Sequence, residues 1–214
     1  MAKERLAIIG AGELGLQALH YAELSGQYSV IAFFDDNTKE DINGLPILGT
    51  IEELSSQYST GAFDKVFISL GYRHLLKRKS LYDNIKSLSI PLGSIIAPNV
   101  FIDPSASIGE GCLLYPGVII DKQVTIAPNV ILNLGCVISH DSKVCSHSFF
   151  APHVTVAGFS TIGEKCFIGC GSTIINDIEI TQDVVLGAGS LVVKNITESG
   201  LYFGVPARKQ GLVV

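Results

Sequence analysis

The sequence has 214 residues, of which 47% are hydrophobic and 16% are charged. This length and composition predict a well-buried globular protein with one large domain or two small ones, and they exclude a disordered chain. The formal net charge of −5 provides no basic field for DNA or RNA, so nucleic-acid binding is excluded as a primary role.

The apolar segments of the sequence indicate neither a membrane-spanning helix nor a secretory signal. No apolar run approaches the roughly 18 residues that a membrane-spanning helix needs. The first residues also lack the apolar core of a secretory signal. We therefore expect a cytoplasmic protein with no membrane span.

A glycine-rich loop follows the first predicted strand. Residues 6–9 read as a buried strand, and the sequence GAGELG at positions 10–15 then leads into a predicted helix. In this strand-to-helix context, glycines let the backbone approach a diphosphate, and the helix N-terminus supplies amide donors. Gly10, Gly12 and Gly15 are therefore candidate nucleotide-binding residues.

Two aspartates end the second predicted strand, residues 28–34. Asp35 follows Gly15 by 35 − 15 = 20 residues, the spacing of a carboxylate that holds a ribose hydroxyl, and Asp36 is next to it. Alone, these features indicate an NAD-binding domain. Only about 95 residues precede the next domain, which is roughly one mononucleotide-binding half. A nucleotide or nucleotide-sugar site therefore fits better, and NAD binding stays an alternative that predicts protection of this domain by NAD(H).

A repeat of six residues dominates the rest of the chain. From Ile96 to Val192 a branched aliphatic residue or Phe recurs without a slip, which makes (192 − 96)/6 + 1 = 17 hexapeptides. A small or β-branched residue stands four places after each one. This period fits neither a helix nor a continuous strand, but it fits short strands joined by turns, as in a parallel β-helix. We place the domain boundary between residues 94 and 95.

The five cysteines suit packing better than bridging. Cys112, Cys136 and Cys166 occupy the inward fourth position of the repeat, where a small hydrophobic residue is needed. Cys145 and Cys170 lie elsewhere, and the chain contains no CxxC spacing. We expect neither disulfides nor a metal site.

The repeat resembles the left-handed β-helix acyltransferases, in which three hexapeptides form one triangular coil. By that resemblance, 17 hexapeptides give between five and six coils, following an α/β Rossmann-like domain. The order of parts over essentially the whole chain is similar to sugar acyltransferases related to bacterial sialic acid O-acetyltransferases and UDP-4-amino-sugar N-acetyltransferases. In the latter, the N-terminal domain holds the nucleotide end of the sugar. The resemblance thus implies substrate binding by Gly10, Gly12, Gly15, Asp35 and Asp36.

A histidine is the natural base for acyl transfer near neutral pH. His140 and Asp141 match the family motif of His followed by an acid, so the resemblance implies that His140 is the general base and that Asp141 orients it. A solvated turn histidine is the alternative. His147 and His153 do not fall where the family places a functional histidine.

Two positions depart from the family pattern. Phe149 stands where the 4-amino-sugar enzymes often have a second histidine, and Leu14 replaces a histidine before the last glycine of the loop. These departures leave the base in place but weaken the assignment of an amine acceptor.

The resemblance also implies residues for acetyl-CoA. Gly158 aligns with a glycine whose amide faces the thioester carbonyl, although a turn glycine with positive φ is an equal alternative. Gly187 and Ala188 match the segment along which pantetheine lies. Lys194 and Lys209 match basic positions suited to the coenzyme phosphates.

We therefore expect acetyl transfer from acetyl-CoA to a nucleotide-linked sugar, most simply to the amine of a 4-amino sugar. O-acetylation of a sialic acid or related sugar is an alternative, and a catalytically inactive nucleotide-binding scaffold is another. The resemblance implies a homotrimer with active sites between subunits. Outward apolar residues predicted to be available for that contact are Leu113, Ile119, Ile131 and Val137.

Overall fold

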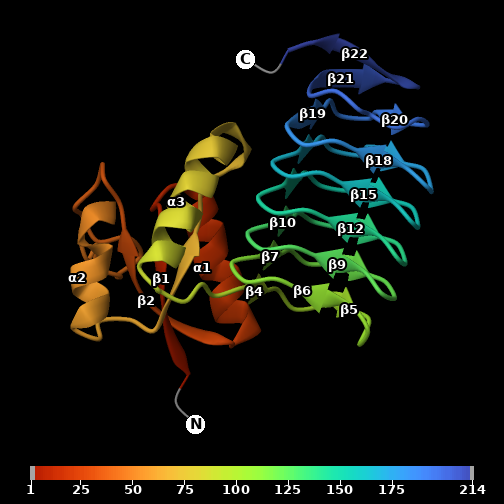
Figure 1. Ribbon diagram of the computed structural model, residues 1–214. Helices are drawn as coiled ribbons and strands as arrows, with labels where there is room; N and C mark the ends of the chain where they lie inside the picture. Colours follow the sequence, from red (N-terminus) through yellow and green to blue (C-terminus); the bar gives the residue numbers. More distant parts are fainter. Residues whose placement is uncertain (1–2, 213–214) are drawn as a thin grey trace. The chain divides into compact units, whose positions relative to one another are not determined.

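The computed structural model describes residues 3–212 and divides into two compact units. The first ends at Pro98 and the second begins at Asn99. Both are drawn in Figure 1. The two units correspond to the predicted α/β domain and the predicted β-helix, so the expected fold class is confirmed.

The first unit is a parallel three-stranded sheet with helices on both sides, in the order β2-β1-β3 (Figure 1). Residues 6–9 of the central strand are at most 1% exposed, which explains their unbroken apolar run. Its elements are β1 (Glu4–Ile9), α1 (Glu13–Ser25), β2 (Tyr28–Phe34), the 3₁₀ turn η1 (Ile51–Glu53), α2 (Leu54–Ser59), β3 (Lys65–Ile68), the 3₁₀ turn η2 (Tyr72–His74), α3 (Leu75–Ser87) and β4 (Ile95–Ile96).

The second unit is a solenoid of very short parallel strands (Figure 1). Each of the 17 repeat residues ends one strand, from Ile96 in β4 to Val192 in β20, so the predicted repeat is confirmed. The strands are β5 (Phe101–Ile102), β6 (Ser107–Ile108), β7 (Leu113–Leu114), β8 (Ile119–Ile120), β9 (Thr125–Ile126), β10 (Ile131–Leu132), β11 (Val137–Ile138), β12 (Lys143–Val144), β13 (Phe149–Phe150), β14 (Thr155–Val156), β15 (Thr161–Ile162), β16 (Phe167–Ile168), β17 (Thr173–Ile174), β18 (Glu179–Ile180), β19 (Val184–Leu186), β20 (Leu191–Val192), β21 (Gly200–Gly204) and β22 (Ala207–Gly211).

Three sheets form the faces of the solenoid, and each coil adds one strand to each sheet. Within this unit the strand orders are β22-β21-β19-β16-β13-β10-β7, β20-β17-β14-β11-β8-β5 and β18-β15-β12-β9-β6. Val137 pairs with Thr155, and Thr155 pairs with Thr173, so residues in register are 18 positions apart. Any residue can therefore be placed above or below another by adding or subtracting 18.

The interior of the solenoid contains small polar side chains as well as aliphatic ones. Ser160 is fully buried; its Oγ donates to the Ile175 carbonyl at 3.0 Å and accepts the Ile178 N–H at 3.2 Å. Ser142 and Ser148 make the equivalent bonds to the next coil. These hydroxyls thus satisfy groups that would otherwise be buried without partners.

The buried cysteines have the packing role that the repeat predicts. Cys112, Cys136 and Cys166 are fully buried, and all five cysteines are free thiols. Burial raises the pKa of Cys136 and of Cys166 to about 12, so these thiols stay protonated.

Replacing Ser160 with alanine should destabilise the solenoid. The Ile178 N–H would lose its acceptor inside the core, at a cost of about 1–3 kcal/mol of unfolding free energy. Urea denaturation followed by circular dichroism measures this loss. Ser107→Ala is the control, because Ser107 is exposed; its effect should stay within about 0.5 kcal/mol. Equal midpoints for the two variants would contradict the prediction.

Two of the four residues predicted to be exposed for a subunit contact are buried. Ile119 is 43% exposed and Val137 is partly exposed, as predicted, but Leu113 and Ile131 are fully buried in the single chain. The prediction that those two residues are available for a subunit contact is therefore wrong. The repeat predicts which side chains point out of the solenoid, but it does not predict which of them are covered by other parts of the chain.

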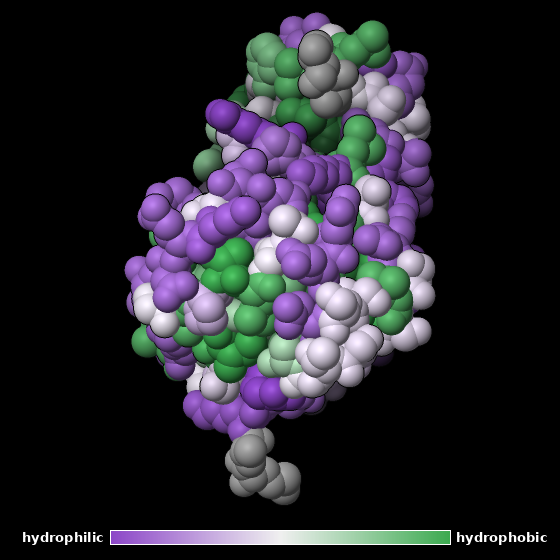
Figure 2. Space-filling model, turned by 90° about the vertical axis from the view of Figure 1, so that its left-hand side faces the viewer, coloured by the Kyte–Doolittle hydropathy of each residue, from purple (hydrophilic) through white to green (hydrophobic). Residues whose placement is uncertain are grey.

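Figure 2 shows one face of the molecule coloured by hydropathy. On the side nearest α2, hydrophilic residues occupy most of the area and hydrophobic groups show in smaller areas between them (Figure 2). No helix within residues 3–212 is both long enough and apolar enough to cross a bilayer.

Candidate active site

His140 and Asp141 lie at the turn that follows β11, and their side chains meet. His140 Nδ1 is 3.0 Å from Asp141 Oδ2. The side chains are 46% and 32% exposed, respectively. A carboxylate partner favours the tautomer with the proton on Nδ1, which leaves a lone pair on Nε2. The two side chains are therefore in direct contact, although residues that are adjacent in a turn often are not.

Backbone geometry explains why the two side chains converge. Asp141 has φ 58°, a left-handed conformation that Asp tolerates better than most residues. One coil earlier, Asp121 holds the turn, because its Oδ2 accepts the His140 N–H at 3.2 Å and its Oδ1 accepts the Lys122 N–H at 2.7 Å. Asp121 was not predicted from the sequence, although subtracting 18 from Ser139 would have placed it at this corner.

Gly158 packs directly against the imidazole of His140. A methyl group at Gly158 would lie 2.6 Å from His140 Cε1 and 2.8 Å from Nε2, so any side chain here would displace the imidazole. Gly158 is not among the glycines with positive φ, which contradicts the alternative explanation of a left-handed turn glycine. The imidazole, rather than the backbone, is the reason for this glycine.

The amide of Gly158 is also available as a donor. Among the residues that the structure describes, its N–H has no acceptor, whereas the neighbouring Ala157 and Phe159 amides bond to Ile174 and His140 carbonyls. Gly158 itself is buried. An unpaired amide beside a histidine suits an oxyanion that arrives with a substrate.

The glycine loop lies in the first unit, and internal packing explains two of its three glycines. A methyl group on Gly15 would lie 2.1 Å from the Gly10 carbonyl oxygen, and one on Gly10 would lie 2.7 Å from Ser69 Oγ. A methyl group on Gly12 would meet nothing within 4 Å. Only Gly12 therefore leaves open space beside the loop.

A matched pair of variants separates these roles. Gly15→Ala should lower the thermal unfolding midpoint, because the new methyl group would clash with the Gly10 carbonyl oxygen and the backbone would have to shift. Gly12→Ala should leave that midpoint nearly unchanged and weaken nucleotide binding instead. Differential scanning calorimetry and titration calorimetry measure the two effects. The interpretation fails if Gly12→Ala unfolds earlier than Gly15→Ala.

Asp35 braces the glycine loop. Its Oδ2 accepts the Ala11 N–H at 2.8 Å, and its Oδ1 accepts the N–H groups of Asn37 and Thr38 at 2.8 and 3.2 Å. Partial burial opposes the charge, but these donors and the charge of Lys77 outweigh it, so the pKa of Asp35 lies below its ordinary value. Asp35 is therefore an ionised part of the loop, with little capacity left for a ribose.

Asp36 is the more accessible member of the pair. It is exposed, and its Oδ1 accepts the Ile51 N–H at 3.0 Å, where η1 begins. A carboxylate has more acceptor positions than this one bond uses. Of the two aspartates, Asp36 is thus better placed to contact a ligand.

The predicted coenzyme residues lie near the C-terminal end of the solenoid. A hollow of about 340 Å³ is lined by Lys194, Arg208 and Lys209, among others. Lys209 also pairs with Glu198 at 2.6 Å. Ala188 is exposed, whereas a methyl group on Gly187 would lie 2.8 Å from Phe203 Cβ, so the packing of Phe203 already requires that glycine.

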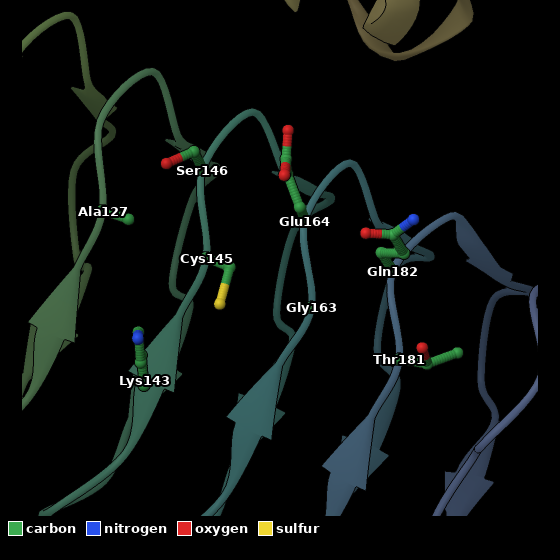
Figure 3. Close-up of a pocket in the computed structure, with 8 residues that line it drawn as sticks. All are labelled: Ala127, Lys143, Cys145, Ser146, Gly163, Glu164, Thr181 and Gln182. Carbon is green, nitrogen blue, oxygen red and sulfur yellow. The ribbon is translucent and has the colours of Figure 1, made fainter.

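A larger hollow, of about 530 Å³, follows the ends of the strands β12, β15 and β18 (Figure 3). Its lining includes none of the predicted site residues. Cys145 lies in it, and burial raises the pKa of that thiol. In the described part of the chain, no three His, Cys, Asp or Glu side chains are grouped to hold a metal ion.

The two halves of the chain match two known families. Residues 96–202, half of the chain, match the GMPPB C-terminal domain, and residues 5–85 match the PglD N-terminal domain. The structure superposes on the acetyltransferase domain of PglB from Neisseria gonorrhoeae FA1090 with a TM-score of 0.90 and 28% identity, over 97% of this chain and 100% of that one. The chain belongs to the hexapeptide-repeat sugar acyltransferases.

Other members of this left-handed β-helix acyltransferase family have been solved with ligands. The PglB domain was solved with acetyl coenzyme A. PerB from Caulobacter crescentus, in complex with CoA and GDP-perosamine, superposes with a TM-score of 0.89 and 29% identity, over 96% of this chain and 97% of that one.

Curated relatives match a smaller part. The UDP-3-O-acylglucosamine N-acyltransferase of Bordetella pertussis is 36% identical over 63 residues, which is 29% of this chain. The matched segment spans only 17% of that acyltransferase's own length.

The other two histidines of the solenoid, His147 and His153, contact residues other than His140. His147 is 4% exposed and its Nδ1 is 2.8 Å from Asn129 Nδ2. His153 is exposed and its ring covers Gly135. Phe159 was not predicted from the sequence, and its ring centroid is 5.0 Å from that of His140. Adding 18 to Asp141 would have found it.

Proposed function

We propose that this protein transfers an acetyl group from acetyl-CoA to the amine of a nucleotide-linked 4-amino sugar. The observation that carries the proposal is the local arrangement around His140. Asp141 engages one imidazole nitrogen, and Gly158 brings an unpaired amide beside the ring. A base and an oxyanion donor are the two groups that direct acyl transfer needs.

In the proposed reaction, His140 Nε2 removes a proton from the sugar amine as the nitrogen attacks the thioester carbonyl. Asp141 keeps the tautomer that leaves Nε2 unprotonated and favours the imidazolium that forms. The Gly158 N–H donates to the oxygen of the tetrahedral intermediate. When that intermediate collapses, the imidazolium protonates the leaving thiolate of coenzyme A, and no acyl-enzyme is required.

Ligands of the relatives support the choice of substrates. The PglB domain with acetyl coenzyme A and PerB with CoA and GDP-perosamine have this architecture over nearly their full lengths. In the present chain, we assign the nucleotide to the open side of the loop at Gly12, with Asp36 as a contact. We assign the coenzyme to Gly158, Ala188 and Lys194, with its phosphates near the basic hollow at Arg208 and Lys209.

We further propose a homotrimer that works in the cytoplasm, where acetyl-CoA is available. The partly exposed apolar residues Ile119 and Val137 support a subunit contact on that face. Light scattering coupled to size-exclusion chromatography tests the trimer, and a monomer at micromolar concentration contradicts it.

A substrate screen tests the activity. Purified protein is mixed with acetyl-CoA and with nucleotide-linked 4-amino sugars or sialic acids, and free thiol is followed with time. Turnover with an amino sugar and a product that is heavier by one acetyl group supports N-acetylation. Turnover confined to hydroxyl acceptors supports O-acetylation. Binding of a nucleotide without binding of acetyl-CoA instead supports an inactive scaffold.

A further inference from the structure

We propose that Phe159 is a positioning residue for the His140 imidazole. The proposal rests on the proposed function, in which His140 is the base. Phe159 lies at the corner of the solenoid one coil after Asp141, and its ring is nearly perpendicular to that of His140, at 85° with centroids 5.0 Å apart. This is the edge-to-face geometry that aromatic pairs favour.

Phe159 is unusual for its place in the fold. At this corner, Gln123, Asp141, Phe159 and Asp177 stack 18 residues apart, and all have positive φ between 56° and 59°. The other three are polar. Phe159 is 58% exposed and has φ 59°, a conformation that is uncommon for a bulky side chain. Neither burial nor backbone preference explains an aromatic residue here, so a functional explanation is favoured.

The contacts of His140 give that explanation. Asp141 engages Nδ1, the missing side chain of Gly158 leaves room for Cε1 and Nε2, and Phe159 stands against the ring at a right angle. The Phe159 N–H also donates to the His140 carbonyl at 3.1 Å, which ties the two turns together. His140 is nearly half exposed, so the Phe159 contact restricts the rotamers that the Asp141 contact alone would leave open.

Kinetics of Phe159→Ala and Phe159→Tyr test the proposal. We expect Phe159→Ala to lower kcat by roughly three- to tenfold, the rate equivalent of one aromatic contact, with little change in KM for acetyl-CoA. Phe159→Tyr keeps the ring and should retain wild-type kcat. Leu24→Ala, which removes a 56% exposed apolar side chain from α1, should have no effect.

A double-mutant cycle distinguishes positioning from a general structural effect. In the His140→Ala background, Phe159→Ala should lower the residual turnover no further, because the ring that it holds is gone. An equal loss in both backgrounds would overturn the proposal, and so would an unchanged kcat in the single variant.

Nitrogen-15 NMR of the imidazole gives a readout that does not depend on turnover. In the wild-type protein we expect a single tautomer with the proton on Nδ1, and in Phe159→Ala a mixture of tautomers. A spectrum unchanged by Phe159→Ala would overturn the positioning role. If His140→Ala kept full turnover, the proposed base would fail instead, and the spectra would still show whether Phe159 holds the ring.

Discussion

Replacing His140 with alanine should lower kcat by roughly 10²–10⁴-fold, the usual loss for a general base. The sugar amine would then have to lose its proton to water, with no group oriented by Asp141 to receive it. Because His140 is partly exposed at a turn, the substitution creates no cavity in the core. The thermal unfolding midpoint and the affinity for acetyl-CoA should therefore stay close to wild type.

The fold offers a matched control for that variant. His153 is another exposed corner histidine, with φ 59°, and its ring covers Gly135 much as the ring of His140 covers Gly158. His153→Ala should keep wild-type kcat. The assignment is wrong if both histidine variants lose activity equally, or if His140→Ala acetylates the cognate sugar at the normal rate.

Gly158→Ala should lower kcat by about 100-fold, the cost of misplacing a reacting group by about 1 Å. The new methyl group would lie 2.6 Å from His140 Cε1, so the imidazole has to move. The displacement also separates Nε2 from the amide proposed to bind the oxyanion. Since Gly158 lacks a positive φ, alanine fits the backbone, and the effect should appear in kcat rather than in stability.

Two further variants make the Gly158 measurement specific. Gly211→Ala, where a methyl group meets nothing within 4 Å, controls for the substitution itself and should be neutral. The double variant of His140→Ala with Gly158→Ala should be no slower than His140→Ala alone, because the displaced group is absent. A further loss in the double variant would mean that Gly158 acts mainly through its own amide.

The sequence predicted the solenoid unusually well because the repeat is a physical constraint on every coil. A residue that faces the interior must be small or aliphatic, and the absence of insertions keeps the count exact from Ile96 to Val192. Because residues in register are 18 positions apart, contacts between coils can also be predicted by counting. Asp121 and Phe159 could have been found near His140 in this way.

Other features depend on three-dimensional contacts that no periodicity contains. The burial of Leu113 and Ile131 depends on what lies over their strands. The engagement of Asp35 with the Ala11 amide depends on how two turns approach each other. Gly158 was predicted as an oxyanion donor, but only the structure relates the absence of its side chain to the His140 ring.

The serine hydrogen bonds between coils have a consequence for how this enzyme family can diversify. Ser142, Ser148 and Ser160 each reach only the next coil, so the stability of the solenoid is approximately a sum of nearest-neighbour terms. The Phe159 side chain takes no part in those hydrogen bonds. New acceptor preferences can therefore arise by changes at the corners while the hydrogen-bonded interior remains as it was.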